Sequence, residues 1–392
     1  MNKFDERLQI FNEAAGIKRV KRIPFVANIF NWVAYDSPYK LTELLNDPKK
    51  ITESFLLLEE KYQFDALFFS SLPTNYIRIT DPLGGATGHV IDDETNSVQV
   101  KDISFMNYDE LEEFADNPIV FSWTKLMLRK FPLLNSEGAI AKLKQSMLNM
   151  LEYFQADDLT IKILKEKYQV PNFITPGAIM SSAILPIEQL YTTYRGIKNT
   201  AIDMRKDPIK YKEILIKLEK YYVDPYLKAV GASEYGSTPD AILDTSIALL
   251  SHNMMNVKQF EMFLWPHLKM MIDAAAAKGK VIIIYAEGEI MRFIDYFQEI
   301  PKGTVILYSE NDNIFELKKK LPNICLFGGM PCYMLGRSSK ETCVDYAKKL
   351  IDELGRDGGY VFSQDKMISF ASDCKPENLK AVSELVLTYG VN

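Results

Sequence analysis

The chain has 392 residues, of which 47% are hydrophobic and 25% are charged, and its net charge is −6 at pH 7. This balance is typical of a soluble globular protein, and the mild acidity without a basic run argues against nucleic acids and anionic membrane surfaces as partners. The four cysteines lack CxxC spacing and the chain starts without an apolar leader, so we expect neither a disulfide framework nor a zinc ribbon, and we expect a cytoplasmic protein.

The first part of the chain predicts two strands and then an interruption. The expected elements are a helix over residues 4–15, a strand over 23–29, a helix over 48–62 and a strand over 65–70. Residues 72–168 then break the alternation. Glycines and a polar turn at 92–96 suggest a β-hairpin, and from about 107 the pattern is helical.

The rest of the chain repeats one pattern, in which a short apolar run ends in polar or glycine residues and a helix follows. The runs cover residues 170–175, 241–245, 281–285, 304–308, 324–327 and 360–363. Short buried strands that alternate with helices indicate a parallel sheet.

With the two strands at 23–29 and 65–70, these six runs give eight strands, which predicts a (β/α)8 TIM barrel. We expect one domain over residues 1–392, with a helical and hairpin insertion at about 72–168 after the second strand. A doubly wound sheet is the alternative, but the chain has neither of the glycine-rich phosphate-binding motifs that accompany such sheets. In a barrel of this type the loops that follow the strands carry the chemistry.

Four segments of the C-terminal half resemble the uroporphyrinogen decarboxylase superfamily, which also contains the corrinoid-dependent methyltransferases. The segments are residues 328–331 (GGMP), 348–352 (KKLID), 358–363 (GGYVFS) and 375–382 (KPENLKAV). The first 230 residues are similar in layout more than in motif.

The chain departs from that pattern at two places. The decarboxylases carry an arginine-rich segment for porphyrinogen carboxylates, whereas residues 28–35 (NIFNWVAY) contain no arginine. Members that methylate thiols bind zinc through His-x-Cys and a later Cys, where this chain has Tyr285-Ala286-Glu287 and Lys366. The resemblance therefore implies a methyltransferase of the O-demethylase type.

Demethylation of an ether requires that the leaving oxygen be protonated or held by a Lewis acid. Glu287 is the first candidate, either as a zinc ligand or as a general acid, although an acid there also suits the cap of a helix starting near residue 288. Glu310 follows the next strand, and Lys366 is expected to neutralise the leaving oxygen or to pair with Glu287. His252 is a candidate zinc ligand or acid, with a surface histidine as the alternative.

Four aromatic residues are expected to line an apolar substrate pocket, although aromatic residues after barrel strands are also common in packing. They are Phe30, Trp32, Tyr35 and Tyr76.

The expected function is transfer of a methyl group from a methylated small molecule, in the first place a methoxylated aromatic, to a Co(I) corrinoid. No Asp-x-His-x-x-Gly motif occurs, so the corrinoid would be carried by a separate protein that docks on an exposed, partly apolar rim of the barrel. A decarboxylase of a less anionic substrate and a non-enzymatic small-molecule binding protein remain alternatives. The sequence leaves the oligomeric state open.

Overall fold

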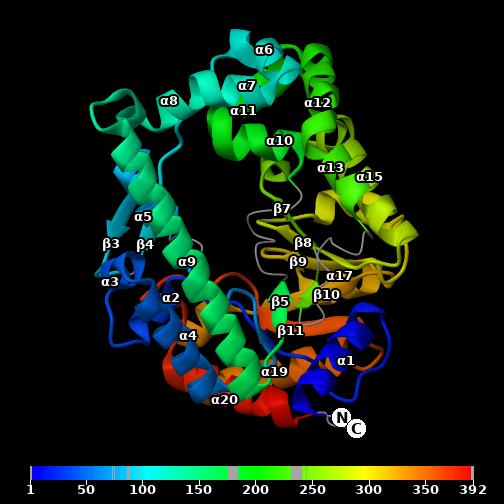
Figure 1. The fold of residues 1–392 in the computed structure, drawn as a ribbon. Helices are drawn as coiled ribbons and strands as arrows, with labels where there is room; N and C mark the ends of the chain where they lie inside the picture. Colours follow the sequence, from blue (N-terminus) through cyan, green and yellow to red (C-terminus); the bar gives the residue numbers. More distant parts are fainter. Residues whose placement is uncertain are drawn as a thin grey trace.

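Parallel strands form a cylinder in the computed structural model, which describes residues 2–72, 74, 76–85, 89–95, 97–174, 184–230, 241–243 and 245–389 (Figure 1). The strands are β1 (Val26–Ala27), β2 (Ala66–Leu67), β5 (Asn172–Ile174), β6 (Ala241–Leu243), β7 (Thr245–Leu249), β8 (Ile282–Ala286), β9 (Val305–Ser309), β10 (Cys325–Met330) and β11 (Tyr360–Gln364).

The pairing of these strands runs once around the cylinder. Strands β7 to β11 form a continuous parallel sheet in chain order, and β11 bridges to the β1 segment through Phe25 and Phe362. Strand β1 pairs with β2, β2 lies against β5, and β5 pairs with β6. Only residue 244 separates β6 from β7, so the two occupy one strand position. The eight positions confirm the predicted (β/α)8 barrel.

Some strands differ in extent from the prediction. Within the predicted runs at 23–29 and 65–70 the regular ladder covers only Val26–Ala27 and Ala66–Leu67. Isolated bridges from Phe25 to Phe362 and from Ile29 to Ile368 continue the pairing of the first run with the β11 side. The fourth strand is longer than 241–245 and continues to Leu249, with the buried Thr245, Ile247 and Leu249 alternating with less buried residues. Residue 175 lies outside the described residues.

Helices cover the outside of the cylinder. They are α1 (Lys3–Ala15), α2 (Trp32–Tyr35), α3 (Leu41–Asn46), α4 (Pro48–Tyr62), α14 (Val257–Gln259), α15 (Trp265–Ala277), α16 (Ile294–Gln298), α17 (Ile314–Lys320), α18 (Cys332–Arg337), α19 (Lys340–Leu354) and α20 (Pro376–Thr388). The start of α4 shows why its bounds were predictable. Asp47 accepts a hydrogen bond from Lys49 N, and Pro48 occupies the first helical position.

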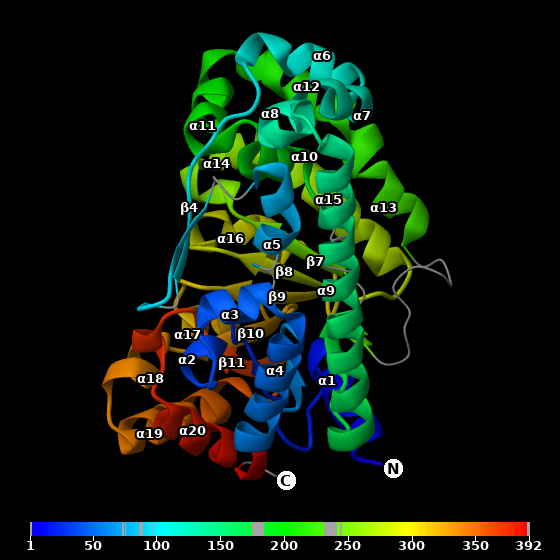
Figure 2. The same ribbon diagram turned by 60° about the vertical axis from the view of Figure 1, so that its left-hand side comes forward.

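The predicted insertion after the second strand is present. It contains α5 (Tyr76–Thr80), the antiparallel hairpin of β3 (His89–Asp92) and β4 (Ser97–Val100), α6 (Leu111–Asp116), α7 (Pro118–Phe121), α8 (Met127–Lys130) and α9 (Ala139–Tyr168). Helix α9 runs alongside α4 and connects the barrel to the helices at the top of both views (Figures 1 and 2). Among the helices that the structure describes, none combines the length and hydropathy needed to cross a bilayer.

A second group of helices follows β5 and packs against the insertion. It comprises α10 (Pro186–Gln189), α11 (Gly196–Lys206), α12 (Pro208–Tyr222) and α13 (Asp224–Ala229). Helix α12 contacts α6, and α10 lies at the C-terminal end of β7, where Glu188 binds Ser251. This helical layer therefore stands over the end of the barrel at which the strands finish.

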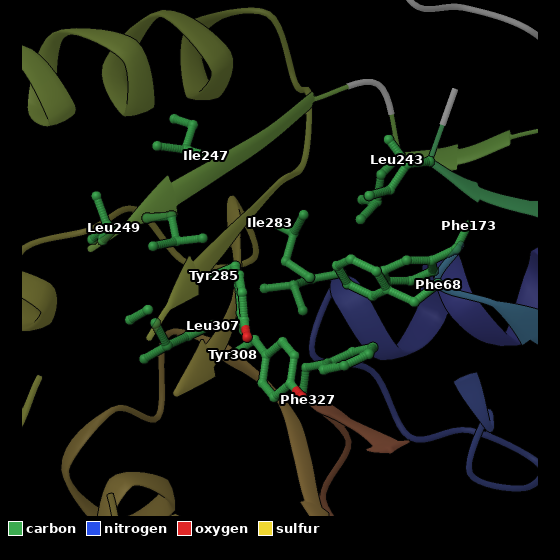
Figure 3. Close-up of a cluster of buried hydrophobic side chains, with 14 of the residues drawn as sticks. Phe68, Phe173, Leu243, Ile247, Leu249, Ile283, Tyr285, Leu307, Tyr308 and Phe327 are labelled. Atoms are coloured by element: carbon green, nitrogen blue, oxygen red, sulfur yellow. The ribbon is translucent and has the colours of Figure 1, made fainter. Parts of the chain in front are cut away.

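Aromatic side chains fill the inside of the barrel below that end (Figure 3). The strand register pairs Tyr285 with Tyr308 and Tyr308 with Phe327, and their ring centroids are 4.7 and 4.8 Å apart. The Phe68 ring packs against all three, with Phe173 beside it at 5.3 Å. Burial of each ring contributes roughly 1.5–3 kcal/mol, so this cluster holds the strands together. The two tyrosine hydroxyls form the boundary between this core and the polar groups above it.

Candidate functional site

Three of the predicted site residues meet at the C-terminal end of the barrel strands. Glu287 directly follows β8, Glu310 directly follows β9, and Lys366 comes two residues after β11. The register of β8 with β9 aligns Ala286 with Ser309, so the two glutamates occupy equivalent positions on neighbouring strands. Electrostatic interaction links Glu310 to both Glu287 and Lys366. We call this end of the barrel, with its polar side chains, the mouth.

Glu287 is a half-buried carboxyl group with a perturbed pKa. Burial raises the pKa of Glu287 from its ordinary value to about 7, and the negative charge of Glu310 adds to the effect. The backbone is fixed, since Glu287 N donates to Leu249 O at 3.0 Å and Glu287 O accepts from the Asn253 amide. Gly288 has φ +118°, and a Cβ there would collide with Asn253, so the turn requires glycine.

The alternative role of Glu287 as a helix cap does not apply. The first helical turn after Glu287 starts at Met291, and the N–H groups of Ile290 and Met291 donate to the Asp312 carboxylate instead. The Glu287 carboxyl is therefore not occupied by a helix N-terminus.

Glu310 is held by a tyrosine. The Tyr285 hydroxyl donates to Glu310 Oε1, from the strand next to the one that Glu310 follows. Burial raises the pKa of Glu310, and Asp365 raises it further, whereas the Tyr285 hydrogen bond and Lys366 lower it. Glu310 is thus a carboxyl group with a fixed orientation between another acid and a cation.

Lys366 is a cation next to the acidic side chains Glu310 and Asp365. Its Nζ lies 3.6 Å from Asp373 Oδ1, and nearly half of the side chain is exposed. It interacts electrostatically with Glu310 and Asp365. An exposed ion pair of this length contributes little to stability, so Lys366 keeps the freedom to approach a developing negative charge.

Glu188 was not singled out from the sequence, although it belongs to the same group of acids. It lies in the first turn of α10 and is only 3% exposed. It accepts hydrogen bonds from Ser251 Oγ at 2.7 Å, from Ser251 N and from Leu250 N. Burial raises the pKa of Glu188 to about 7, against the effect of these bonds, and Glu287 raises it further. Acids are common in the first turn of a helix because they stabilise its dipole, so the sequence does not indicate that Glu188 belongs to the acids of the mouth.

Cys332 and Asp365 follow β10 and β11, so they lie on the side of Glu310 that is away from Glu287. Asp365 Oδ1 accepts from Cys332 N at 2.9 Å, and the Cys332 thiol donates to Lys366 O at 3.4 Å. Burial raises the pKa of Cys332 well above its ordinary value, so the thiol is neutral. In this arrangement the Cys332 thiol serves as a hydrogen-bond donor to the Lys366 carbonyl.

His252 is buried and does not join the carboxyl groups by any contact in the described chain. It lies in a 3-10 turn, Ser251–Met254, and neither ring nitrogen has a hydrogen-bond partner among the described residues. Burial lowers the pKa of His252 to about 4, with a contribution from Arg292, so the ring is neutral at pH 7. It therefore does not serve as a proton donor near neutral pH.

The described residues bring no third ligand to the expected zinc site of Glu287 and His252. Within them, no three His, Cys, Asp or Glu side chains gather closely enough to hold a metal ion. A zinc site in proteins needs at least three such ligands. Zinc binding stays a prediction, and no chemical step is derived through it.

The four predicted aromatic residues occupy different environments. The Phe30 ring is 6.0 Å from Phe69, which stacks edge-on with Phe68 at 4.8 Å, so Phe30 joins the aromatic cluster of the mouth. Trp32 is completely buried and its Nε1 donates to Cys374 O at 2.9 Å, which places it in the packing behind the mouth. Substrate contact by Trp32 therefore has no support in its position.

Tyr35 and Tyr76 lie at the periphery. Tyr35 is 50% exposed and its ring is 6.1 Å from that of Trp32. The Tyr76 hydroxyl contacts His89 Nε2 of the hairpin, and the two rings pack edge-on. Substrate contact by Tyr35 and Tyr76 stays a prediction.

Comparisons with known proteins agree with this architecture. A family model described as uroporphyrinogen decarboxylase (URO-D) matches residues 138–389. Among solved structures, a methyltransferase from Methanosarcina mazei is similar with a TM-score of 0.58 and 15% identity, over 96% of this chain and 97% of that chain. At that identity the likeness shows the fold alone. A search of curated proteins finds no match.

Proposed function

The chain belongs to the uroporphyrinogen decarboxylase family, and from this premise we propose that it transfers a methyl group from a methylated small molecule to a corrinoid. The donor class we propose is a methoxylated aromatic, and the acceptor is the Co(I) corrinoid of a separate protein. The observation that carries the proposal is a carboxyl group at the mouth, Glu287, whose pKa is raised to about 7. Such a group is both protonated and able to release its proton near neutral pH.

Glu287 acts as the general acid in this mechanism. The bond between the ether oxygen and the methyl carbon breaks and leaves its electron pair on the oxygen. The Glu287 proton moves to that oxygen, while the methyl carbon bonds to Co(I) through the electron pair of the metal. Glu287 then recovers a proton from solvent, so charge and atoms balance over the cycle.

The neighbouring groups influence the pKa of Glu287 and the charge that develops on the leaving oxygen. The charge of Glu310 raises the pKa of Glu287, and the Tyr285 hydrogen bond fixes the Glu310 carboxylate in place. Lys366 lies within electrostatic reach of Glu310 and Asp365 and offsets part of the negative charge that develops on the leaving oxygen. The apolar rings of Phe30, Phe69 and Phe68 provide a surface for an aromatic donor.

The rim of the mouth supports docking of a corrinoid protein. Three aromatic side chains that follow β1, β10 and β11 are exposed, namely Tyr35 at 50%, Tyr333 at 64% and Phe370 at 36%. Exposed aromatic residues are enriched at protein interfaces. They follow strands that end at the mouth, which is the side from which we propose that cobalt approaches the methyl carbon.

The acidity of the mouth disfavours decarboxylation of a porphyrinogen, which carries several carboxylates. Electrostatic interaction links Glu188 to Glu287, Glu287 to Glu310, and Glu310 to Asp365. Burial raises the pKa of each of the four acids. A substrate with several carboxylates would meet like charges there.

The proposal is tested by mixing the protein with a Co(I) corrinoid protein and a panel of methoxyarenes. The expected result is the absorbance change of methylcobalamin formation together with release of one phenol per methyl group. CO₂ release from a porphyrinogen without methyl transfer would establish the decarboxylase. Ligand binding without turnover, with partner and reductant supplied, would establish a binding protein instead.

A further inference from the structure

Two buried amide side chains below the mouth each have one polar atom that is open, meaning that it has no hydrogen-bond partner among the described residues. Asn28 follows β1 and Gln364 ends β11, and both are fully buried. The Asn28 Nδ2 group reaches across the barrel to donate to the Tyr308 hydroxyl at 2.8 Å. Gln364 Oε1 accepts from Asn28 N at 2.8 Å. Among the described residues, Asn28 Oδ1 and Gln364 Nε2 then have no partner.

The Tyr308 hydroxyl adds a third open position. Its oxygen accepts the Asn28 bond, and no acceptor for its own proton is found in the described chain. Burial raises the pKa of Tyr308 well above its ordinary value, so the hydroxyl keeps that proton. The Tyr308 ring lies 4.7 Å from Tyr285, whose hydroxyl donates to Glu310. The three open positions are therefore next to the proposed reaction site.

Open hydrogen-bonding atoms of this kind are costly. A buried donor or acceptor without a partner costs about 1–3 kcal/mol, and folded proteins contain few of them. Gln364 Oε1 is fixed as an acceptor by the Asn28 backbone N–H. Turning the Asn28 amide over would let Tyr308 O–H donate to Oδ1 and leave Nδ2 without a partner, so in either orientation this pair leaves one donor and one acceptor open. Two such atoms on residues that touch each other indicate that a bound group supplies the missing hydrogen-bond partners.

The open positions specify the completing group. Tyr308 O–H and Gln364 Nε2 are donors, and Asn28 Oδ1 is an acceptor. A hydroxyl oxygen accepts two hydrogen bonds and donates one, which matches this set. An ether or a carboxylate cannot donate, and a negative group would also meet Glu310 and Asp365, which already interact with Tyr308.

We propose that Asn28, Tyr308 and Gln364 form a subsite that binds a neutral hydroxyl group of the substrate. The inference rests on the proposed function for the reaction and adds the class of donor, a methoxyarene that also carries a free hydroxyl. The subsite would orient the ring so that its methoxy oxygen faces the Glu287 carboxyl. These residues determine specificity through substrate contact, and the proton transfer stays with Glu287.

Binding to matched ligands tests the subsite without turnover. Calorimetry compares the three methoxyphenol isomers with the corresponding methoxytoluenes, in which a methyl group replaces the hydroxyl. We expect at least one methoxyphenol to bind about tenfold or more tightly than its methyl counterpart. Tyr308→Phe and Asn28→Leu should reduce that preference to about threefold or less.

Tyr360→Phe is the matched control. Tyr360 is also fully buried, but its hydroxyl is already used, because it donates to Gly328 O at 2.9 Å. This variant loses a buried hydroxyl as Tyr308→Phe does, so it should lose similar stability and keep the ligand preference. Urea denaturation of all variants checks that each is folded under the binding conditions.

Each outcome decides one of the two proposals. No preference in the wild type, or a preference that survives Tyr308→Phe and Asn28→Leu, would overturn the subsite and leave a site completed by ordered water. Methyl transfer from methoxytoluenes as fast as from methoxyphenols would also overturn it while the reaction stands. A preference that disappears in both variants, in a protein that transfers no methyl group, would support the subsite and refute the reaction.

Discussion

Replacing Glu287 by glutamine removes the proposed acid while the shape of the side chain is kept. The raised pKa means that the ionised form of Glu287 is disfavoured in the folded protein. A rise from 4.5 to about 7 corresponds to roughly 3 kcal/mol for a fully shielded group, and partial solvation reduces this to about 1–3 kcal/mol. Glu287→Gln should therefore gain that stability at pH 8, where the native carboxyl is charged, and little at pH 5.

The same substitution should slow methyl transfer. General acids typically contribute factors of 10²–10⁴, so we expect the rate at pH 7 to fall by about 100-fold or more. In the wild type the rate should decline as pH rises through about 7, because the acid form is lost. The variant should lack that decline. The assay is the absorbance change of the Co(I) corrinoid protein, followed from pH 5.5 to 8.5.

Glu289→Gln is the control for this experiment. Glu289 lies two residues further along the same loop and is exposed. Its replacement should change neither the rate nor the stability at pH 8. The reasoning is refuted if Glu287→Gln keeps more than a third of the wild-type rate, or if its pH profile retains the decline near 7.

The structure makes further predictions. Glu188 is buried and its pKa is raised to about 7, so the folded state binds its proton more tightly than the unfolded state. The free energy of unfolding should therefore fall between pH 4.5 and 7, by roughly 1 kcal/mol per pH unit from this group, and Glu188→Gln should flatten the pH dependence seen in urea denaturation; an unchanged slope would contradict the assignment. Tyr285→Phe removes a hydrogen bond that favours the ionised form of Glu310, so the decline of the rate with pH should move to lower pH, and a fixed midpoint would speak against coupling of Glu310 with Glu287. Lys366→Met should lower kcat by about tenfold with little effect on KM, whereas a change confined to KM would assign Lys366 to binding. Trp32→Phe should cost about 1–2 kcal/mol in urea denaturation through the lost bond to a buried carbonyl, with KM unchanged; a raised KM would return Trp32 to the substrate pocket.

The barrel was predictable because its evidence is local. Each strand is a short apolar run followed by polar residues, and parallel strands bring the residues after them to one end. That rule alone places Glu287, Glu310 and Lys366 together, as the structure does. The regular ladder between the first two strands is shorter than the predicted runs, although bridges at Phe25 and Ile29 extend the pairing of the first run toward β11.

The remaining parts of the site depend on contacts between distant segments. Glu188 belongs to the acidic group only because α10 folds onto the end of β7, 62 residues or more along the chain. His252 follows a strand as a ligand would, yet its ring is enclosed by neighbours such as Phe293, whose centroid is 6.4 Å away. The open atoms of Asn28 and Gln364 follow from side-chain geometry across the barrel. Single-sequence patterns carry no information on such pairings.

Titration of the Glu287 carboxyl tests the central claim most directly. The infrared difference spectrum between the wild type and Glu287→Gln isolates the carbonyl band of the protonated acid, which is followed as a function of pH. The account predicts a midpoint near 7. A midpoint near the ordinary value of 4.5 would mean that Glu287 is ionised at neutral pH and holds no proton for a leaving oxygen.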